Sequence, residues 1–316
     1  MSMTCKFKWY LFLCLLPLVH CSKEKQEAEA AIQMQTLVRE ISAYTKTQKP
    51  GFLIIPQNGL ELAFADLDPH SALDLSYVLA VDGFGVEELH YDGKLNPDPE
   101  RITAAQQLGQ FKPVLVAELI NDPATYSAAV QINQQNGFLS FIRTADNHDY
   151  LKIPSQIEGE NTRDIEQLDD AQNYLYLIST DAFATKDALL DAVSQTNYDV
   201  LLIDLFFEEE QLTASDLAGI RRKANGGKRL VIAYVNIGAA ENYRYYWLSG
   251  WKRGNPEWLK KNYPGYPDEI YVVYWNQEWK DILFGDGNAY LDRIIAAGFD
   301  GAYLDNVEAY YFLYHK

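Results

Sequence analysis

Residues 198–207 read YDVLLIDLFF, and the same plan of a short apolar run followed by a polar residue returns in RLVIAYVN at 229–236 and FDGAYLDN at 299–306. Each run is apolar on both faces, which is typical of a strand covered on both sides. Stretches of helical pattern separate the runs, and alternating strands and helices indicate parallel βα units. This alternating pattern therefore predicts an α/β fold.

Nine strands of this kind are expected, at residues 52–56, 77–81, 113–117, 138–142, 174–178, 200–203, 230–235, 270–274 and 301–304. A (β/α)8 barrel needs eight strands and about 250 residues. The run at 138–142 is the best candidate for the surplus strand, because no clear helix precedes it. We expect a single-domain TIM-type (β/α)8 barrel over residues 51–316, with a doubly wound open sheet as the alternative.

The first 20 residues are expected to be a lipoprotein signal peptide. Two lysines precede the apolar run at residues 9–19, which is too short to cross a bilayer that needs about 20 residues. Cys21 and the polar residues after it resemble a lipobox, although His20 replaces the usual small residue, so lipidation of Cys21 is predicted; an ordinary signal peptide cut nearby is the alternative. Residues 21–50 would form a tether and a first helix, and the protein would be exported and anchored to a membrane at the cell envelope or surface.

Composition argues against several classes of site. The 316 residues include 27 Lys and Arg against 44 Asp and Glu, a formal net charge of −17. Because nucleic acid needs a basic surface, no nucleic-acid partner is expected. All three cysteines lie at or before residue 21 and the histidines are scattered, so no thiol nucleophile or zinc site is predicted.

Acidic residues follow the predicted strands at their carboxyl ends, where barrel active sites lie. Asp82, Glu118, Asp204 and Asp305 each end an apolar run, and Glu241 lies a few residues beyond another. Any one of them could instead cap a helix. Several acids around one opening favour cleavage of a glycosidic bond, in which one carboxyl protonates the leaving oxygen and another acts as nucleophile or base.

Aromatic residues crowd the carboxyl-terminal part of the chain. Five of the six tryptophans lie within residues 247–279, and 12 of the 22 tyrosines lie within residues 243–314. Sugar rings stack on such side chains, although core packing is the alternative explanation for each of them. The candidate substrate contacts, including polar groups that can hydrogen-bond to a sugar, are Asn58, Asp82, Asp204, Tyr234, Glu241, Arg244, Trp275 and Tyr303.

Three blocks of the sequence resemble glycoside hydrolase family 114, the endo-α-1,4-polygalactosaminidase-like barrels. They are RLVIAYVNIGAAENYRYYW at 229–247, YVVYWNQEW at 271–279 and GFDGAYLDNVEAYYF at 298–312. The amino-terminal half resembles a secreted branch of the family less closely, through IIPQNGLEL at 54–62 and KPVLVAEL at 112–119.

The resemblance implies a TIM-type barrel that hydrolyses α-1,4-linked, galactosamine-containing polysaccharide without a metal or organic cofactor. It implies that Asp305 and Glu118 form the catalytic pair. It also places Asp204 and Glu241 at further acidic positions of the cleft. A cationic, galactosamine-rich polymer would suit the acidic chain.

The chain departs from the family pattern at acidic positions. Ala239 stands where relatives usually carry Glu, and Glu308 stands where they carry Asp. If the missing Glu is catalytic, the protein is a polysaccharide-binding lipoprotein on a decayed glycosidase barrel, and this is the alternative to an enzyme. Glu269, just before the YVVYW block, is a reserve acid.

Overall fold

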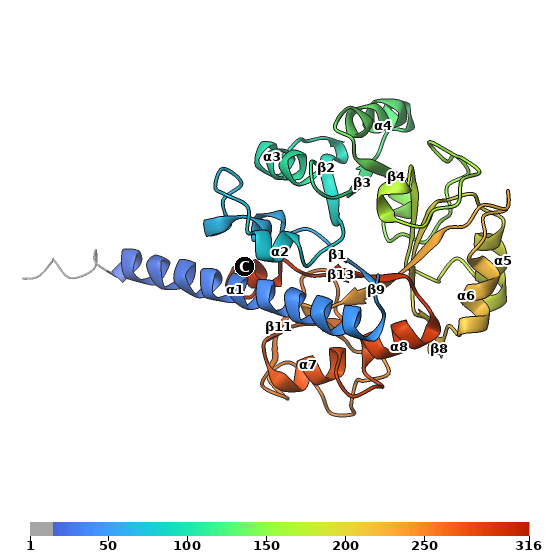
Figure 1. Ribbon diagram of the computed structural model, residues 1–316. Coiled ribbons are helices and arrows are strands. Elements are labelled where there is room, and N and C mark those ends of the chain that lie inside the picture. The colour runs from blue at the N-terminus through green and yellow to red at the C-terminus, as the bar shows by residue number, and fades with distance from the viewer. Residues whose placement is uncertain (1–14, 316) are drawn as a thin grey trace, which may run out of the picture.

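The computed structural model describes residues 15–315, in which helices flank two parallel sheets (Figure 1). The larger sheet has the order β1 (Leu53–Pro56), β13 (Gly301–Asp305), β9 (Leu230–Asn236), β6 (Val200–Asp204) and β5 (Tyr174–Leu177). The smaller parallel sheet has the order β2 (Phe84–Leu95), β3 (Val114–Ile120) and β4 (Leu139–Thr144).

Two junctions bring these sheets together. A parallel bridge pairs Gln57, just after β1, with Gly85 of β2. At the other side β4 contacts β5, where the rings of Phe141 and Tyr174 lie 5.7 Å apart. The eight parallel strands thus follow one another in chain order, which is compatible with a TIM-type fold.

Aromatic side chains fill the space between the strands. Tyr176 of β5 stacks on Tyr150 with 3.8 Å between ring centroids, and it meets the ring of Tyr303 edge-on at 5.5 Å. Gly85 makes room for this packing, because a Cβ there would lie 1.9 Å from the Tyr303 hydroxyl. The interior is therefore a packed core beneath the carboxyl ends of the strands.

The remaining elements are helices and short strands around this core. A third, antiparallel sheet has the order β10, β12, β11, and β7 pairs with β8. The bounds are α1 Leu15–Gln48, α2 Leu75–Val78, α3 Pro99–Leu108, α4 Tyr126–Gln135, α5 Lys186–Ser194, β7 Phe206–Phe207, β8 Glu210–Gln211, α6 Ala214–Ile220, β10 Ala239–Glu241, β11 Leu259–Asn262, β12 Glu269–Val272, α7 Gln277–Leu283, α8 Tyr290–Ala297 and α9 Ala309–Phe312.

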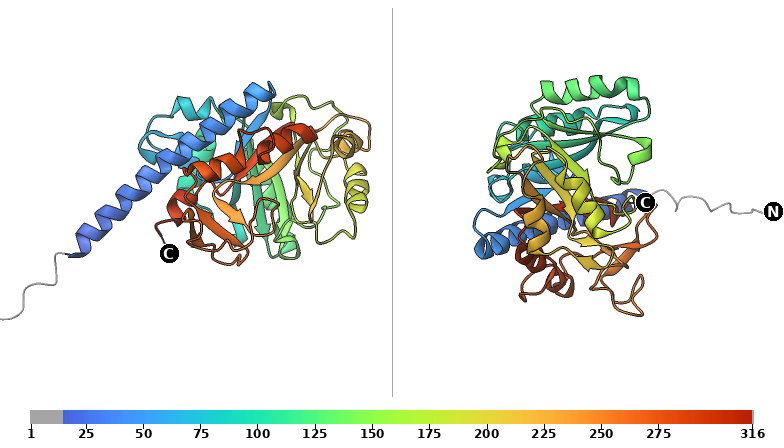
Figure 2. Two further views of the ribbon diagram at one scale, coloured as in Figure 1. Left: turned by 90° about the horizontal axis from the view of Figure 1, so that it is seen from below. Right: turned by 90° about the vertical axis from the view of Figure 1, so that its right-hand side faces the viewer.

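The long helix α1 is docked along only part of its length. Met34, Val38 and Ile41 are fully buried, and the helix contacts α8 and α9. Its amino-terminal part projects beyond the body of the molecule (Figure 2, left). None of the helices within residues 15–315 is long and apolar enough to cross a membrane. The expected signal peptide falls mostly outside the described residues, and lipidation of Cys21 stays a prediction.

Seven of the nine predicted strands belong to the parallel sheets, including 138–142, which is β4 and not surplus. The strand predicted at 77–81 is wrong. Asp74 caps a helix there by accepting hydrogen bonds from the backbone N–H groups of Ser76 and Tyr77, and the true strand is β2. The run at 270–274 overlaps β12, which lies in the antiparallel sheet.

Candidate active site

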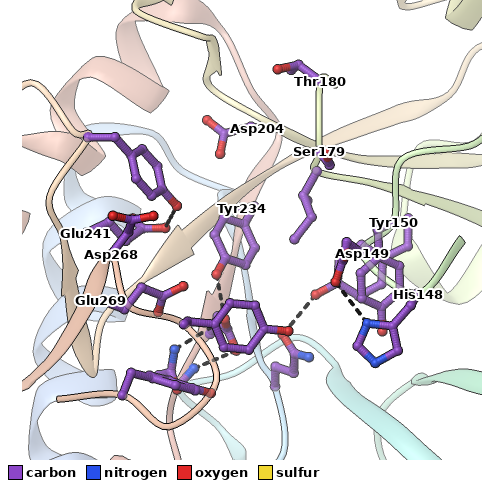
Figure 3. Close-up of a pocket in the computed structure, with 18 of the residues that line it drawn as sticks. His148, Asp149, Tyr150, Ser179, Thr180, Asp204, Tyr234, Glu241, Asp268 and Glu269 are labelled. Atoms are coloured by element: carbon purple, nitrogen blue, oxygen red, sulfur yellow. Dashed lines mark hydrogen bonds and ion pairs between the residues drawn. The ribbon is translucent and has the colours of Figure 1, made fainter. Parts of the chain in front are cut away.

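A cleft of about 770 Å³ opens at the carboxyl ends of the parallel strands. Asn58 after β1, Asp204 at the end of β6 and Asp305 at the end of β13 all line it. Tyr234, Glu241 and Glu269 point into the same space (Figure 3). The predicted residues that the structure brings together are Asn58, Asp204, Tyr234, Glu241, Arg244 and Asp305.

Asp305 has a carboxyl group suited to proton transfer. The Tyr234 hydroxyl donates a hydrogen bond to its Oδ2 at 2.5 Å, and the N–H of Asn306 donates to Oδ1 at 2.7 Å. Burial, followed by the charge of Glu87, raises the pKa of Asp305 to about 7 despite these two donors. A carboxyl group with this pKa still carries its proton for much of the time near neutral pH and can act as a general acid.

Glu87 of β2 is the carboxylate whose charge acts on Asp305. The Tyr150 hydroxyl donates a hydrogen bond to its Oε1, and Asn58 Nδ2 donates to its Oε2 at 3.4 Å. Asn58 is itself oriented by the N–H of Glu87, which donates to the amide oxygen at 3.1 Å. The two donors thus hold the carboxylate of Glu87 in one orientation at the cleft.

Arg244 holds two of the predicted acids in a buried cluster. Its Nη1 and Nη2 donate to the two oxygens of Asp204 at 2.9 and 2.7 Å, and its Nε donates to Glu241 at 2.7 Å. Tyr243 donates to the other Glu241 oxygen at 2.6 Å. Removing one member of such a buried ion pair costs about 3–5 kcal/mol. Asp204 and Glu241 are therefore fixed by Arg244 at the cleft wall.

Two further acids in the cleft have raised pKa values. Burial and the charges of Glu241 and Asp305 raise the pKa of Glu269 to about 8. Burial, with Glu87 and Asp305 contributing, raises the pKa of Glu308 to about 8 although Arg101 opposes the shift. Both groups are mostly protonated at neutral pH and can donate hydrogen bonds to a sugar.

Glu118 does not reach the cleft. Successive residues of a strand point to opposite faces, and the register pairs Leu119 with Arg143, which lines the cleft. Glu118 therefore faces the opposite side of β3, where it is fully buried and accepts a hydrogen bond from Asn133 of α4 at 3.3 Å. The prediction that Glu118 is catalytic needs correction, because the side chain lies on the wrong face of the strand.

The carboxylate of Glu118 instead fixes an irregularity in β2. The pairing of β2 with β3 shifts between Glu87 and Asp92. Within this bulge the N–H groups of His90 and Tyr91 donate to Glu118 at 3.1 and 3.0 Å. Glu118 thus has a structural role, because it holds the part of β2 that directly follows Glu87.

Three other predicted contacts also lie elsewhere. Asp82 precedes β2, accepts a hydrogen bond from the N–H of Ile54 at 2.8 Å and pairs with Lys46 of α1 at 2.9 Å, so it lies at the opposite end of the sheet. Trp275 packs against Tyr274 outside the cleft. Tyr303 is fully buried in the core below the cleft.

The sequence gives only weak signals for Glu87, Arg143 and Tyr150, which all line the cleft. The pair Glu87 and Glu88 within an apolar stretch is the best of these signals. Arg143 pairs with Glu88, 55 positions earlier in the sequence, at 2.7 Å, and it lies over the ring of Tyr150 at 4.5 Å.

Parallel sheets with a carboxylate-lined cleft at the strand ends are the architecture of many sugar-cleaving enzymes. Residues 171–315, just under half of the chain, match the model of glycoside-hydrolase family GH114. The match includes Asp204, Glu241, Glu269 and Asp305.

Curated relatives are uncharacterized proteins from three organisms. One from Deinococcus radiodurans is 41% identical over 121 residues, 38% of this chain and 37% of the relative. One from Thermotoga maritima is 36% identical over 118 residues, 37% of this chain and 35% of the relative. One from Methanocaldococcus jannaschii is 31% identical over 173 residues, 55% of this chain and 48% of the relative. The chain thus spans about a third to a half of the length of these relatives.

Proposed function

We propose that the protein is an endo-acting glycoside hydrolase that cleaves α-1,4-linked, galactosamine-containing polysaccharide on a TIM-type barrel. The observation that carries the proposal is Asp305, a cleft carboxyl group whose pKa is raised to about 7 by burial and by the charge of Glu87. The match of residues 171–315 to the model of family GH114 supports the same chemistry.

In this proposal the catalytic pair is Asp305 and Glu87. Glu87 takes the place of Glu118, which the sequence led us to expect. Asp305 protonates the glycosidic oxygen as the bond to the anomeric carbon breaks. Glu87, held in place by hydrogen bonds from Tyr150 and Asn58, either attacks the anomeric carbon or takes a proton from the attacking water. Tyr234, which donates to Asp305, holds the acid in place.

The charge of the cleft supports an amino sugar as substrate. Eleven carboxylic acids line the cleft against two arginines, Arg143 and Arg244. Both arginines are already paired with carboxylates. The excess of acid attracts a protonated amine and disfavours an acidic sugar.

We place this enzyme at the cell envelope or surface, exported by the signal peptide and anchored by a lipid on Cys21. The part of α1 that projects from the body would then lead from the anchor to the folded enzyme (Figure 2, left).

The alternative is a lipoprotein that binds the polymer without cleaving it. It is favoured by Ala239, which stands where family members usually carry Glu. Ala239 is buried in β10 two residues before Glu241, so a longer side chain there would extend from the same face of the strand as Glu241.

Release of reducing ends from partly deacetylated α-1,4-galactosaminan tests the proposal. Wild type is expected to release them, and Asp305→Asn and Glu87→Gln are each expected to lower the rate about 100-fold or more. Glu257→Gln, an exposed acid outside the cleft, serves as the control and is expected to match wild type. Saturable binding by wild type without any new reducing ends would support the alternative instead.

A further inference from the structure

A second hollow, of about 430 Å³, adjoins the cleft, and Pro267 and Asp268 line both. Glu269 of β12 lines the cleft, whereas the next residue, Ile270, lines the second hollow. Neighbouring residues of a strand point to opposite faces. The first residues of β12 therefore form a wall shared by the two hollows. The exposed Pro267 and Asp268, just before the strand, form the rim between them.

The second hollow contains the outer end of a row of four tryptophans. The rings of Trp247 and Trp251 line it with centroids 5.5 Å apart, and both are half-buried. Trp251 lies 5.0 Å from the buried Trp258, which in turn lies 5.5 Å from the fully buried Trp279.

Hydrogen bonds fix the inner end of this row. Trp258 donates through Nε1 to Glu278 at 2.8 Å, and Trp279 donates to the carbonyl oxygen of Ile237 at 2.9 Å. The outer pair, Trp247 and Trp251, is thus presented on a rigid base. Rigid, partly exposed aromatic rings are suited to stacking against the apolar face of a sugar.

The charge of the second hollow is opposite to that of the cleft. Lys252 and Arg253 line it, and neither forms an ion pair with a carboxylate within the described part of the chain. Asp268 is its one acid. A protonated amino sugar is therefore disfavoured there, whereas the amides of Asn242 and Asn262 can hydrogen-bond to hydroxyl and acetamido groups.

We infer that the second hollow is a subsite for a neutral, N-acetylated unit of the polysaccharide chain whose charged unit occupies the cleft. The inference rests on the proposed function. The chain would cross the rim at Pro267 and Asp268 and stack on Trp247 or Trp251. The protein would accordingly favour partly acetylated chains over chains that carry only free amines.

Binding in an Asp305→Asn background tests this subsite apart from catalysis. The probes are size-matched α-1,4-galactosaminan oligosaccharides, one set partly N-acetylated and one fully deacetylated, titrated by calorimetry. Asp305→Asn/Trp251→Ala and Asp305→Asn/Trp247→Ala are each expected to bind the partly acetylated set about three- to tenfold more weakly than Asp305→Asn. Phe111→Ala in the same background removes an exposed aromatic outside both hollows and is the control.

A charge reversal tests the preference for a neutral sugar. Adding Lys252→Glu and Arg253→Glu to the Asp305→Asn background changes two exposed side chains and is expected to raise affinity for the fully deacetylated set. Unchanged binding of the partly acetylated set by both tryptophan variants would overturn the subsite even if wild type hydrolyses the polymer. Weakened binding in those variants supports the subsite even if wild type releases no reducing ends, a result that would refute only the proposed enzyme.

Discussion

The pKa of Asp305 is the balance of opposing local effects. Burial and the charge of Glu87 favour the protonated carboxyl, whereas the hydrogen bonds from Tyr234 and Asn306 favour the carboxylate. The resulting pKa of about 7 leaves the acid form available near neutral pH. If Asp305 is the general acid, activity should fall as pH rises through that value.

Tyr234→Phe should move this alkaline limb to higher pH. The substitution removes a donor that favours the charged form of Asp305, so the pKa of Asp305 should rise. A pH–rate profile of kcat measures the shift, which we expect to be about one unit or less. A shift to lower pH would contradict the role of the Tyr234 hydroxyl.

Asp305→Asn should stabilise the fold while removing activity. A carboxyl group with a folded-state pKa of about 7, above its unfolded value, costs stability as pH rises from about 4 through 7. An amide has no proton to lose, so we expect the variant to gain about 4 kcal/mol at pH 7.5, the free energy that corresponds to a rise in pKa from about 4 to about 7, and nothing at pH 4. Urea unfolding at the two pH values measures this, and a loss of stability at pH 7.5 would contradict the raised pKa.

At the scale of elements, the bulge in β2 decides which acids face the cleft. Glu88 has a φ of 53°, in the left-handed region, and the pairing with β3 shifts beside it. The carboxylate of Glu118 satisfies two backbone N–H groups that the bulge leaves without strand partners. The conformation of β2, which carries Glu87, thus depends on Glu118 of β3.

Glu118→Ala should therefore lower the free energy of unfolding and leave kcat of the folded protein less affected. The N–H groups of His90 and Tyr91 would lose a buried acceptor, and we expect a loss of about 2–4 kcal/mol. Glu118→Gln keeps one acceptor oxygen and should lose less. Urea unfolding together with kcat separates the two roles: a Glu118→Gln variant with wild-type stability and no activity would restore Glu118 as a catalytic residue.

At the scale of the whole molecule, charge is divided between the cleft and its surroundings. The chain has a formal net charge of −17, and the cleft concentrates eleven acids. Attraction of a cationic polymer should weaken with salt, because the screening length falls to about 10 Å at 0.1 M. KM for a partly deacetylated polymer should rise between 0.02 and 0.5 M NaCl by roughly tenfold. A KM that is independent of salt would argue for a neutral substrate.

The sequence predicts the strands that are continuous apolar runs, because such runs are fixed by burial on both faces. It misses β2, since a bulge and the adjacent Glu87 and Glu88 interrupt the apolar pattern. The sequence correctly predicts that Asp305 lies at the cleft, but the prediction for Glu118 is wrong. A shift of one residue along a strand moves a side chain to the opposite face of the sheet, and the apolar run alone does not show which face Glu118 occupies. The contacts between Glu87 and Tyr150 join distant segments and have no local signal.

Hydrolysis in water enriched in ¹⁸O tests the central claim most directly. Each cleavage by the proposed chemistry places one oxygen from water at a new reducing end. Mass spectrometry of partly deacetylated α-1,4-galactosaminan should therefore show shorter, singly labelled fragments with wild type and none with Asp305→Asn or Glu87→Gln. Absence of labelled fragments with wild type, or their release at the wild-type rate by Asp305→Asn, would contradict the account.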